Sequence, residues 1–334
     1  MKAIIIGYII FILLAVLLYF NWQAMAPQAK KFNPQVFVLN KGEGVKDIAV
    51  RLKEAGLIKN DKLFEGVVFL INVKNKFWPG QYYLSPDMDL IEVIKVLISR
   101  PKPEEVSATI IEGWSNQEIA AYLEKLGLVK HDDFLAVLKN NQDKFRNKYD
   151  WLKDVPESIN LEGFLFPDTY SFFKKTTSND IIEKMLENFD QKITLDMLVD
   201  IKKDQRTLFQ VVTMASLIEK EAALDADRRL IADIFWRRLD NNIALQSCAS
   251  VNYVLGIARK QLSLDDTRTP SPYNTYLHRG LPPGPIDNPS LLSIKAAIYP
   301  LANDYWFFLA TDSGKTIFSK TKEEHDKNKQ IYLK

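Results

Sequence analysis

The sequence predicts an α+β protein with an N-terminal transmembrane helix, a small α/β domain and a larger helix-rich domain with short strands. Three observations lead to this prediction: an uncharged apolar run at the N-terminus, a repeated segment with mixed strand and helix patterns, and longer helical patterns in the second half. With 334 residues, the chain is long enough for two domains. We expect an anchor at 1–22, a linker at 23–34, a small domain at 35–104 and a large domain at 105–334.

Composition excludes several classes of function. The formal net charge is only +2, whereas a protein that coats nucleic acid normally has a strong basic excess, so we expect no nucleic-acid partner. The single cysteine, Cys248, cannot form a disulfide within the chain. No Cys/His spacing indicates a metal site, and no motif implies an organic cofactor.

The N-terminal apolar run predicts a membrane anchor. Residues 3–20 carry no charge, and a helix of that length spans roughly 27 Å, close to the ~30 Å hydrocarbon thickness of a bilayer. A cleaved signal peptide is the alternative, because residues 24–26 (AMA) have the small-x-small form of a cleavage site. The length of the run favours a retained anchor. Either interpretation places the chain from about residue 30 onward on the extracytoplasmic side of the cytoplasmic membrane, and the retained anchor predicts a single-pass inner-membrane protein.

A repeat follows the anchor. Residues 41–64 resemble residues 112–135 at a constant shift of 71 positions, with Gly42 matching Gly113 and Gly56 matching Gly127. Each copy has the pattern of a short strand, a glycine turn, an amphipathic helix and a glycine stop. Such small units serve as spacers or as glycan-binding modules, and the sequence favours neither role.

Other segments have clear local patterns. We expect a strand at 80–84, a helix at 87–99, a hairpin formed by 305–310 and 316–318, and a charged helix at 320–329. We also expect Asn288 to be the N-cap of a helix with Pro289 at its first position.

Glu219 is the leading candidate for chemistry. Residues 207–222 predict a helix, and Glu219 lies within its apolar arc rather than opposite it. An ionised carboxylate among apolar side chains is costly, so we expect Glu219 to keep its proton and to be able to act as a general acid. A paired glutamate on a structural helix is the alternative. Leu217 points away from the arc, which predicts that the helix is covered on both sides.

A lone glutamate suits one kind of glycan cleavage. Protonation of the leaving oxygen is needed in every case, and most hydrolases add a second carboxylate. In a muramic-acid sugar, the C6 hydroxyl can instead attack C1, and one carboxyl can then act as both acid and base.

Six segments, in order, resemble the endolytic murein transglycosylases, also called the YceG-like family. They are residues 161–170 (LEGFLFPDTY), 215–222 (ASLIEKEA), 245–247 (LQS), 271–276 (SPYNTY), 280–286 (GLPPGPI), and Phe318-Ser319 with His325. The resemblance covers nearly the whole chain. One departure is Cys248-Ala249, where many members have Asp-Pro, so a carboxylate role at this loop is not expected here.

The resemblance implies an enzyme that cleaves the MurNAc–GlcNAc β-1,4 bond inside nascent glycan strands and leaves 1,6-anhydro-MurNAc ends. It implies that Glu219 is the catalytic acid/base, that residues 35–104 form a LysM-like domain, and that peptidoglycan strands are the substrate. Peptidoglycan synthases are candidate partners.

The remaining candidate site residues are predicted to bind substrate: Gln246, Ser247, Tyr273, Asn274, Tyr276 and Glu162. Gln246 and Ser247 can bond sugar hydroxyls or cap a turn. The two tyrosines can stack on sugar rings, and Asn274 can bond an acetamido group or hold a tight turn. Glu162 can assist at the site, although a structural pairing is favoured.

Two other functions remain open from the sequence. One is a lysozyme-like hydrolase that uses Glu219 with a second carboxylate such as Glu162. The other is a non-catalytic wall-binding scaffold, suggested by the repeated units and the anchor.

Overall fold

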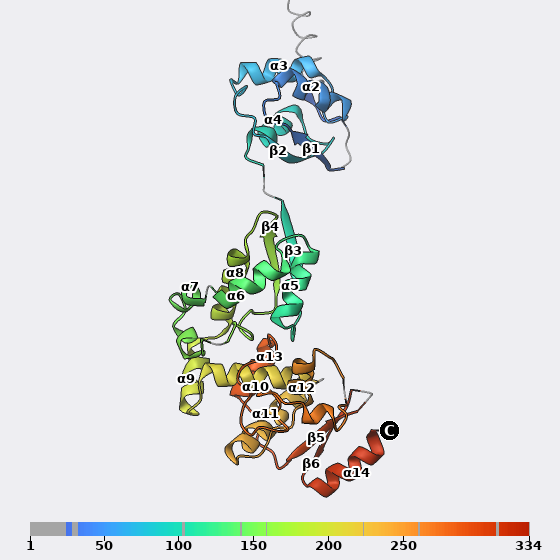
Figure 1. Ribbon diagram of the computed structural model, residues 1–334. Helices are drawn as coiled ribbons and strands as arrows, with labels where there is room; N and C mark the ends of the chain where they lie inside the picture. Colours follow the sequence, from blue (N-terminus) through green and yellow to red (C-terminus); the bar gives the residue numbers. More distant parts are fainter. Residues whose placement is uncertain are drawn as a thin grey trace, which may run out of the picture. The chain divides into compact units, whose positions relative to one another are not determined.

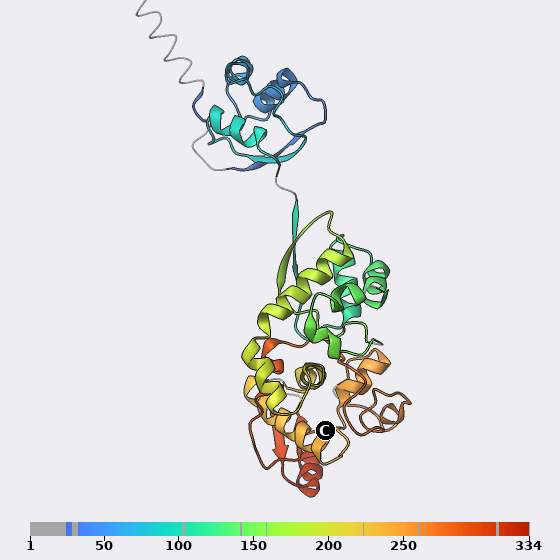
Figure 2. The same ribbon diagram turned by 90° about the vertical axis from the view of Figure 1, so that its left-hand side faces the viewer.

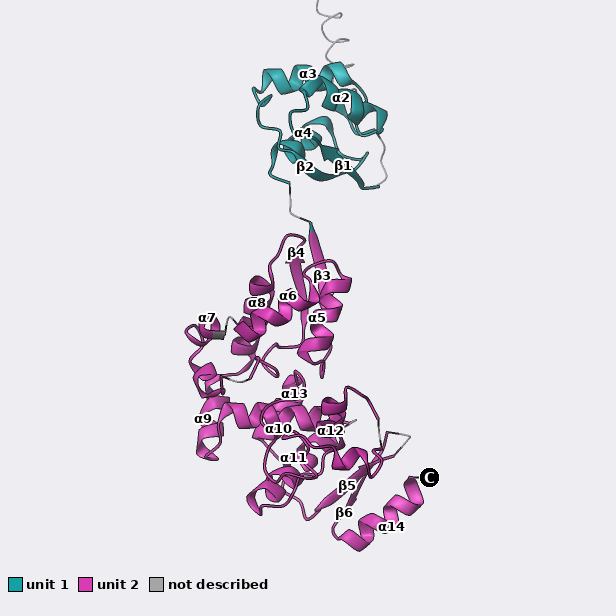
Figure 3. Ribbon diagram, in the orientation of Figure 1, with its two compact units in different colours: residues 1–104 teal, residues 105–334 magenta. Residues whose placement is uncertain are grey.

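The computed structural model describes residues 25–28, 33–101, 104–140, 142–157, 159–222, 224–259, 261–311 and 314–333 (Figure 1). The chain divides into two compact units, residues 1–104 and 105–334 (Figure 3). Helices dominate the described residues, which also form three small antiparallel sheets, so the predicted α+β class is confirmed. The predicted span at residues 3–20 lies outside the described residues. None of the helices that the structure describes is long and apolar enough to cross a membrane.

The first unit is one small sheet covered by helices. Its elements are β1 (Gln35–Leu39), α2 (Val45–Glu54), α3 (Asp61–Leu70), β2 (Gly80–Leu84) and α4 (Leu90–Ile98). β1 and β2 are antiparallel, with Gln35 opposite Leu84. The predicted strand at 80–84 is therefore confirmed. The helix predicted from residue 87 begins at Leu90, because the Asp89 side chain caps it by accepting from the Glu92 amide.

The sequence repeat is also a structural repeat. The second unit opens with the same order of elements: β3 (Glu105–Thr109), α5 (Asn116–Lys125), α6 (His131–Asn140), β4 (Thr169–Phe173) and α8 (Ser178–Lys192). β3 and β4 are antiparallel, as β1 and β2 are. The turn glycines Gly42 and Gly113 both adopt positive φ, at 83° and 76°. The second copy differs in the longer connection before β4, which holds α7 (Gln142–Arg146) and the 3-10 turn η1 (Asp150–Asp154).

Helix α10 is central to the rest of the second unit. The elements there are α9 (Leu195–Lys203), α10 (Leu208–Glu221), α11 (Asp225–Asp240), α12 (Cys248–Leu255), η2 (Asp266–Arg268) and α13 (Leu291–Ile298). α10 packs against α11, α12 and α13, and Figure 2 looks nearly along its axis. Leu217 is fully buried, as is Val212. The prediction that this helix is covered on both sides is thus confirmed.

A hairpin and a helix end the chain. β5 (Phe307–Ala310) and β6 (Thr316–Ser319) pair with Phe307 opposite Ser319, which confirms the predicted hairpin. α14 (Lys322–Tyr332) is the predicted charged helix, and no residue in it is buried.

The predicted cap of α13 is wrong by two residues. The N-cap is Ser290, whose hydroxyl accepts from the Ser293 amide, and the helix begins at Leu291. Asn288 cannot serve as the cap because its side chain already makes five hydrogen bonds to segments far away in the sequence.

Candidate active site

Glu219 lies in the last turn of α10. The helix begins at a capping box, in which the Thr207 hydroxyl accepts from the Gln210 amide and the Gln210 side chain returns the bond. This start fixes the helical phase that directs Glu219 toward the first residues of α13. Only 8% of the Glu219 side chain is exposed.

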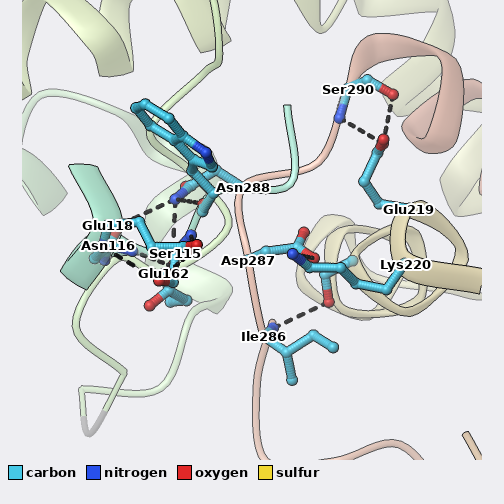
Figure 4. Close-up of polar contacts among 12 residues, drawn as sticks. Ser115, Asn116, Glu118, Glu162, Glu219, Lys220, Ile286, Asp287, Asn288 and Ser290 are labelled. Carbon is cyan, nitrogen blue, oxygen red and sulfur yellow. Dashed lines mark hydrogen bonds and ion pairs between the residues drawn. The ribbon is translucent and has the colours of Figure 1, made fainter. Parts of the chain in front are cut away.

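Two residues, Ser290 and Arg228, bind the Glu219 carboxylate through three donor groups. The amide and the hydroxyl of Ser290 donate to Oε2 at 2.9 Å and 2.5 Å (Figure 4). Arg228 Nη2 lies 3.4 Å from Oε1. The surroundings are thus largely dry, as expected, but they are not purely apolar. The sequence pattern predicted apolar neighbours for Glu219 and gave no sign of these donors.

The turn between β3 and α5 covers Glu219 closely. The Gly113 amide donates to the Asn288 carbonyl at 2.9 Å, which ties this turn to the segment before α13. A Cβ atom on Gly113 would lie 3.4 Å from Glu219 Cγ. Glycine is needed here for its positive φ, and a methyl group at this position would be in van der Waals contact with the Glu219 side chain.

Asn288 joins three segments around the site. Its Oδ1 accepts from the amides of Gly163 and Leu165, and its Nδ2 donates to Trp114, Asn116 and Glu162. The side chain is fully buried. One asparagine therefore holds the 161–170 segment and the start of α5 against the segment that carries Ser290.

Glu162 belongs to this structural network. Its Oε1 accepts from the Asn116 amide at 2.8 Å and from Asn288 Nδ2 at 3.2 Å. The residue is 3% exposed, and burial raises the pKa of its carboxyl to about 8. This placement agrees with the structural role that the sequence favoured over assistance at the site.

With this geometry established, comparison with known proteins identifies the family. A model of the YceG-like family matches residues 37–331. The chain belongs to the YceG-like family. An endolytic murein transglycosylase of Bacillus subtilis is 34% identical, over 87% of this chain and 83% of that protein. One from Streptococcus pneumoniae R6 is 33% identical, over 98% of this chain, which spans 64% of that protein.

The fold agrees with a solved relative. A crystal structure of a YceG-like protein from Listeria monocytogenes has a TM-score of 0.61 and 32% identity. The match covers 89% of this chain and all of that chain. The resemblance predicted from six short segments is therefore confirmed at the level of sequence and fold.

In this YceG-like protein, Ser247 is tied to the end of α10. Its hydroxyl donates to Glu221 at 2.6 Å, and its amide donates to Thr275 Oγ1 at 3.0 Å. Burial raises the pKa of the Glu221 carboxyl, although bonds from Ser247 and from the first amides of α12 oppose the shift. Ser247 is buried, and its hydroxyl bonds to another residue of the same chain, Glu221.

Gln246 has a different environment from Ser247. It is exposed, and its backbone has a φ of 54°, which is strained for a residue with a side chain. Its amide donates to the Thr275 carbonyl at 3.1 Å, which holds this conformation. Gln246 lines a pocket of about 300 Å³ whose other lining residues are Arg238, Ile243, Trp306, Phe307, Lys320, Thr321 and Lys322. Glu219 does not line this pocket.

The 271–276 segment is held mainly by Asn274. Its Nδ2 donates to the carbonyls of Thr267 and Thr269, and its Oδ1 accepts from the Tyr276 amide. The side chain is fully buried, which is the tight-turn role that the sequence left open. The Tyr276 hydroxyl lies 3.1 Å from Cys248 Sγ. Burial raises the pKa of this thiol, so Cys248 is not an activated nucleophile.

Tyr273 remains accessible in part. Its ring lies 5.2 Å from the ring of Tyr253. Contact of Tyr273, Tyr276, Asn274, Gln246 or Ser247 with a glycan stays a prediction.

Sequence reasoning missed two carboxylates near Glu219. Burial raises the pKa of Glu112, and the negative charge of Glu219 raises it further. Asp287 is fully buried, and Lys220 Nζ lies 4.0 Å from its Oδ2. A weak signal was available in the sequence, because Glu112 is the first residue of the second repeat copy and Asp287 directly follows the 280–286 motif.

Proposed function

We propose that this protein is an endolytic lytic transglycosylase with Glu219 as its acid/base. It cleaves the MurNAc–GlcNAc β-1,4 bond of peptidoglycan strands and leaves 1,6-anhydro-MurNAc ends. The observation that carries the proposal is the setting of Glu219, a largely buried carboxylate whose Oε2 is held by two donors of one residue. The endolytic murein transglycosylases among the relatives support the substrate and the reaction.

The proposed reaction has two proton transfers and uses no water. Protonated Glu219 gives its proton to the glycosidic oxygen while the C1–O bond breaks, and the GlcNAc portion leaves as an alcohol. The carboxylate then takes the proton of the C6 hydroxyl as O6 bonds to C1. The 1,6-anhydro ring forms, and Glu219 regains its proton.

The neighbours of Glu219 suit the stage of this reaction that lies between the two proton transfers. Between the two transfers, Glu219 is an anion. The Ser290 amide and hydroxyl and the Arg228 guanidinium are donors aimed at that anion. They stabilise the state with most charge on the enzyme, and they are held in place before substrate arrives.

A lysozyme-like hydrolase is supported less well. Such an enzyme needs a second carboxylate facing the same bond. Glu162, the candidate from the sequence, is 3% exposed, and its Oε1 already accepts two hydrogen bonds. A carboxyl with a pKa of about 8 also holds its proton at neutral pH, so it is a poor nucleophile.

The proposal includes a location. The uncharged run at residues 3–20 supports a single-pass anchor in the cytoplasmic membrane, with the catalytic domain on the extracytoplasmic side. Residues 35–104, within the first unit, are proposed as a LysM-like domain that contacts glycan. Peptidoglycan synthases that make the nascent strand are proposed partners.

Digestion of purified glycan strands tests the function. Wild type should produce 1,6-anhydro ends by mass spectrometry, and Glu219→Gln should produce none while keeping its circular dichroism spectrum. Glu323→Gln, the same change at an exposed position of α14, is the matched control and should remain active. Reducing ends from wild type, or full activity of Glu219→Gln, would overturn the proposal.

A further inference from the structure

The end of α3 exposes three apolar side chains in succession. Phe69, Leu70 and Ile71, which we call the α3 patch, are 75%, 82% and 45% exposed. Val67 and Val68, which precede them, are buried in the core of the first unit. Single exposed apolar residues are common on protein surfaces, but a run of three is unfavourable in water and calls for a function. We therefore expect something other than water to cover this patch.

The second copy of the repeat shows that the fold does not require apolar residues here. At the shift of 71 positions that relates the two copies, the residues that match the α3 patch are Asn140, Asn141 and Gln142. Asn140, the last residue of α6, is exposed as Phe69 is. Polar side chains thus suffice at this helix end in one copy, so a contact explains the apolar side chains of the other copy better than folding does.

The α3 patch lies away from the sheet of the first unit. Figure 1 and Figure 2 both show α3 on the opposite side of this unit from β1 and β2. The chain leaves the unit at the sheet, because Pro101 lies against Gly80, the first residue of β2. The patch and the exit of the chain are therefore on different sides of the unit.

The first unit is close to the predicted membrane span along the chain. Met25 packs against the core of this unit, and the uncharged run ends at Phe20. The stretch of chain between these two residues reaches at most about 18 Å when it is fully extended. With the anchor in a bilayer, the first unit therefore cannot move away from the membrane surface.

A cation lies beside the α3 patch. Lys74 and Phe69 line the same groove, which has a volume of about 420 Å³. Glu65 also lines this groove, but it pairs with Lys62 at 2.9 Å, whereas Lys74 forms no ion pair with any residue that the structure describes. Exposed apolar side chains beside a lysine are typical of protein surfaces that enter the interface of an anionic bilayer.

We propose that the α3 patch inserts into the headgroup region of the membrane that holds the N-terminal anchor. This inference rests on the anchor proposed above and goes beyond it, because it gives the first unit a second contact with the same bilayer. A single tether leaves the unit free to rotate, and the second contact prevents that rotation. Glycan suits the patch less well, because sugar hydroxyls need hydrogen-bonding partners and none of the three side chains offers one.

A fluorophore at position 70 measures the insertion. The full-length chain with Cys248→Ala and Leu70→Cys is labelled with an environment-sensitive dye. It is then reconstituted into vesicles of phosphatidylcholine and phosphatidylglycerol that contain a nitroxide-labelled lipid. Leu195→Cys is the matched control, because Leu195 is an equally exposed leucine, at 80%, in the second unit. We expect the nitroxide to quench the label at position 70 several-fold more than the control label.

Exchange between the repeat copies tests whether the apolar side chains cause the insertion. Phe69→Asn with Ile71→Gln gives the first copy the polar residues of the second and should reduce the quenching to the control level. Val36→Thr with Val38→Thr removes two exposed apolar side chains from β1 instead and should leave the quenching unchanged. Each variant should keep the circular dichroism spectrum of wild type.

Flotation of the vesicles separates this inference from the anchor on which it rests. Protein that does not float with the vesicles would reject the anchor and the inference together. Protein that floats while its label at position 70 is quenched no more than the control label would overturn the inference alone. Quenching that survives the Phe69→Asn and Ile71→Gln exchange, or a label that responds only to added glycan strands, would also overturn it. End formation by the same vesicles tests the proposed reaction independently.

Discussion

Ser290 binds Glu219 twice, because its amide and its hydroxyl both donate to Oε2. The same hydroxyl accepts from the Ser293 amide at 3.2 Å and caps α13. The start of one helix is thus fastened to the end of another through a single side chain. The position of the proposed catalytic carboxylate therefore depends on where α13 begins.

Ser290→Ala tests this double role. The variant loses the hydroxyl bond to a charged group and the cap but keeps the amide bond. We expect kcat to fall by about tenfold or more and the free energy of unfolding to fall by about 1 kcal/mol. Ser290→Thr retains a hydroxyl and should lose much less of either. A kcat for Ser290→Ala equal to that of wild type would contradict the role at Glu219.

Gly113→Ala tests the close cover of Glu219. Gly113 and Gly127 have nearly the same backbone, with φ of 76° and 70°. Alanine at either should cost about 1–2 kcal/mol of stability. Only at Gly113 would the new methyl meet Glu219 Cγ, since a Cβ on Gly127 has no described neighbour within 4 Å.

Activity should therefore separate the two alanine variants. We expect at least about a tenfold loss of kcat/KM for Gly113→Ala and little change for Gly127→Ala beyond its stability cost. Denaturant unfolding and the end-formation assay measure the two quantities. Equal activities would show that the turn does not position Glu219.

Glu162→Gln should change how stability depends on pH. The pKa of Glu162 is about 8 in the folded protein, against an ordinary value of 4.5. Between these values the folded state holds a proton that the unfolded state has lost, so this group makes wild type less stable as pH rises from about 4.5 to about 8. Glutamine removes that loss, and its Oε1 can still accept both bonds.

Urea unfolding from pH 5 to 8 measures this effect. The stability of Glu162→Gln relative to wild type should rise with pH by at least about 1 kcal/mol across the interval. Glu183→Gln is the control, because Lys148 lowers the pKa of Glu183 and this group stays ionised throughout. A constant difference for Glu162→Gln would mean that Glu162 is ionised in the folded protein.

Gln246→Gly separates backbone strain from substrate contact. Gln246 and Asn242 both have a φ of 54°, so glycine should relieve strain at each and stabilise the protein by up to about 1 kcal/mol. Only Gln246 carries a predicted contact to glycan. We expect KM to rise several-fold for Gln246→Gly and not for Asn242→Gly, and an unchanged KM would remove Gln246 from the binding residues.

Local patterns in the sequence predicted the helix of Glu219 well. The apolar period of 3.6 residues places Glu219 on the face toward α13, and Thr207 marks the start of the helix. Both signals lie within a few turns of the residue they describe. The hairpin of β5 and β6 was predictable for the same reason.

The network around Asn288 was not predictable from local patterns. Its bonds reach Gly163 and Leu165, which lie 125 and 123 residues away along the chain. Asn-Pro before a helical pattern resembles a cap, and the local signal alone cannot reveal that a tertiary contact has taken the side chain. Asp287 is similar, because its burial follows from the same long-range packing.

The two copies of the repeat differ in what their first turn touches. Gly113 lies against Glu219, whereas a Cβ on Gly42, the matching glycine of the first copy, has no described atom within 4 Å. The turn at Gly113 therefore contacts the proposed catalytic residue, whereas the Cβ position of Gly42 faces open space. A short epitope or a fluorophore inserted next to Gly42 should report where this protein resides in the cell without disturbing glycan cleavage.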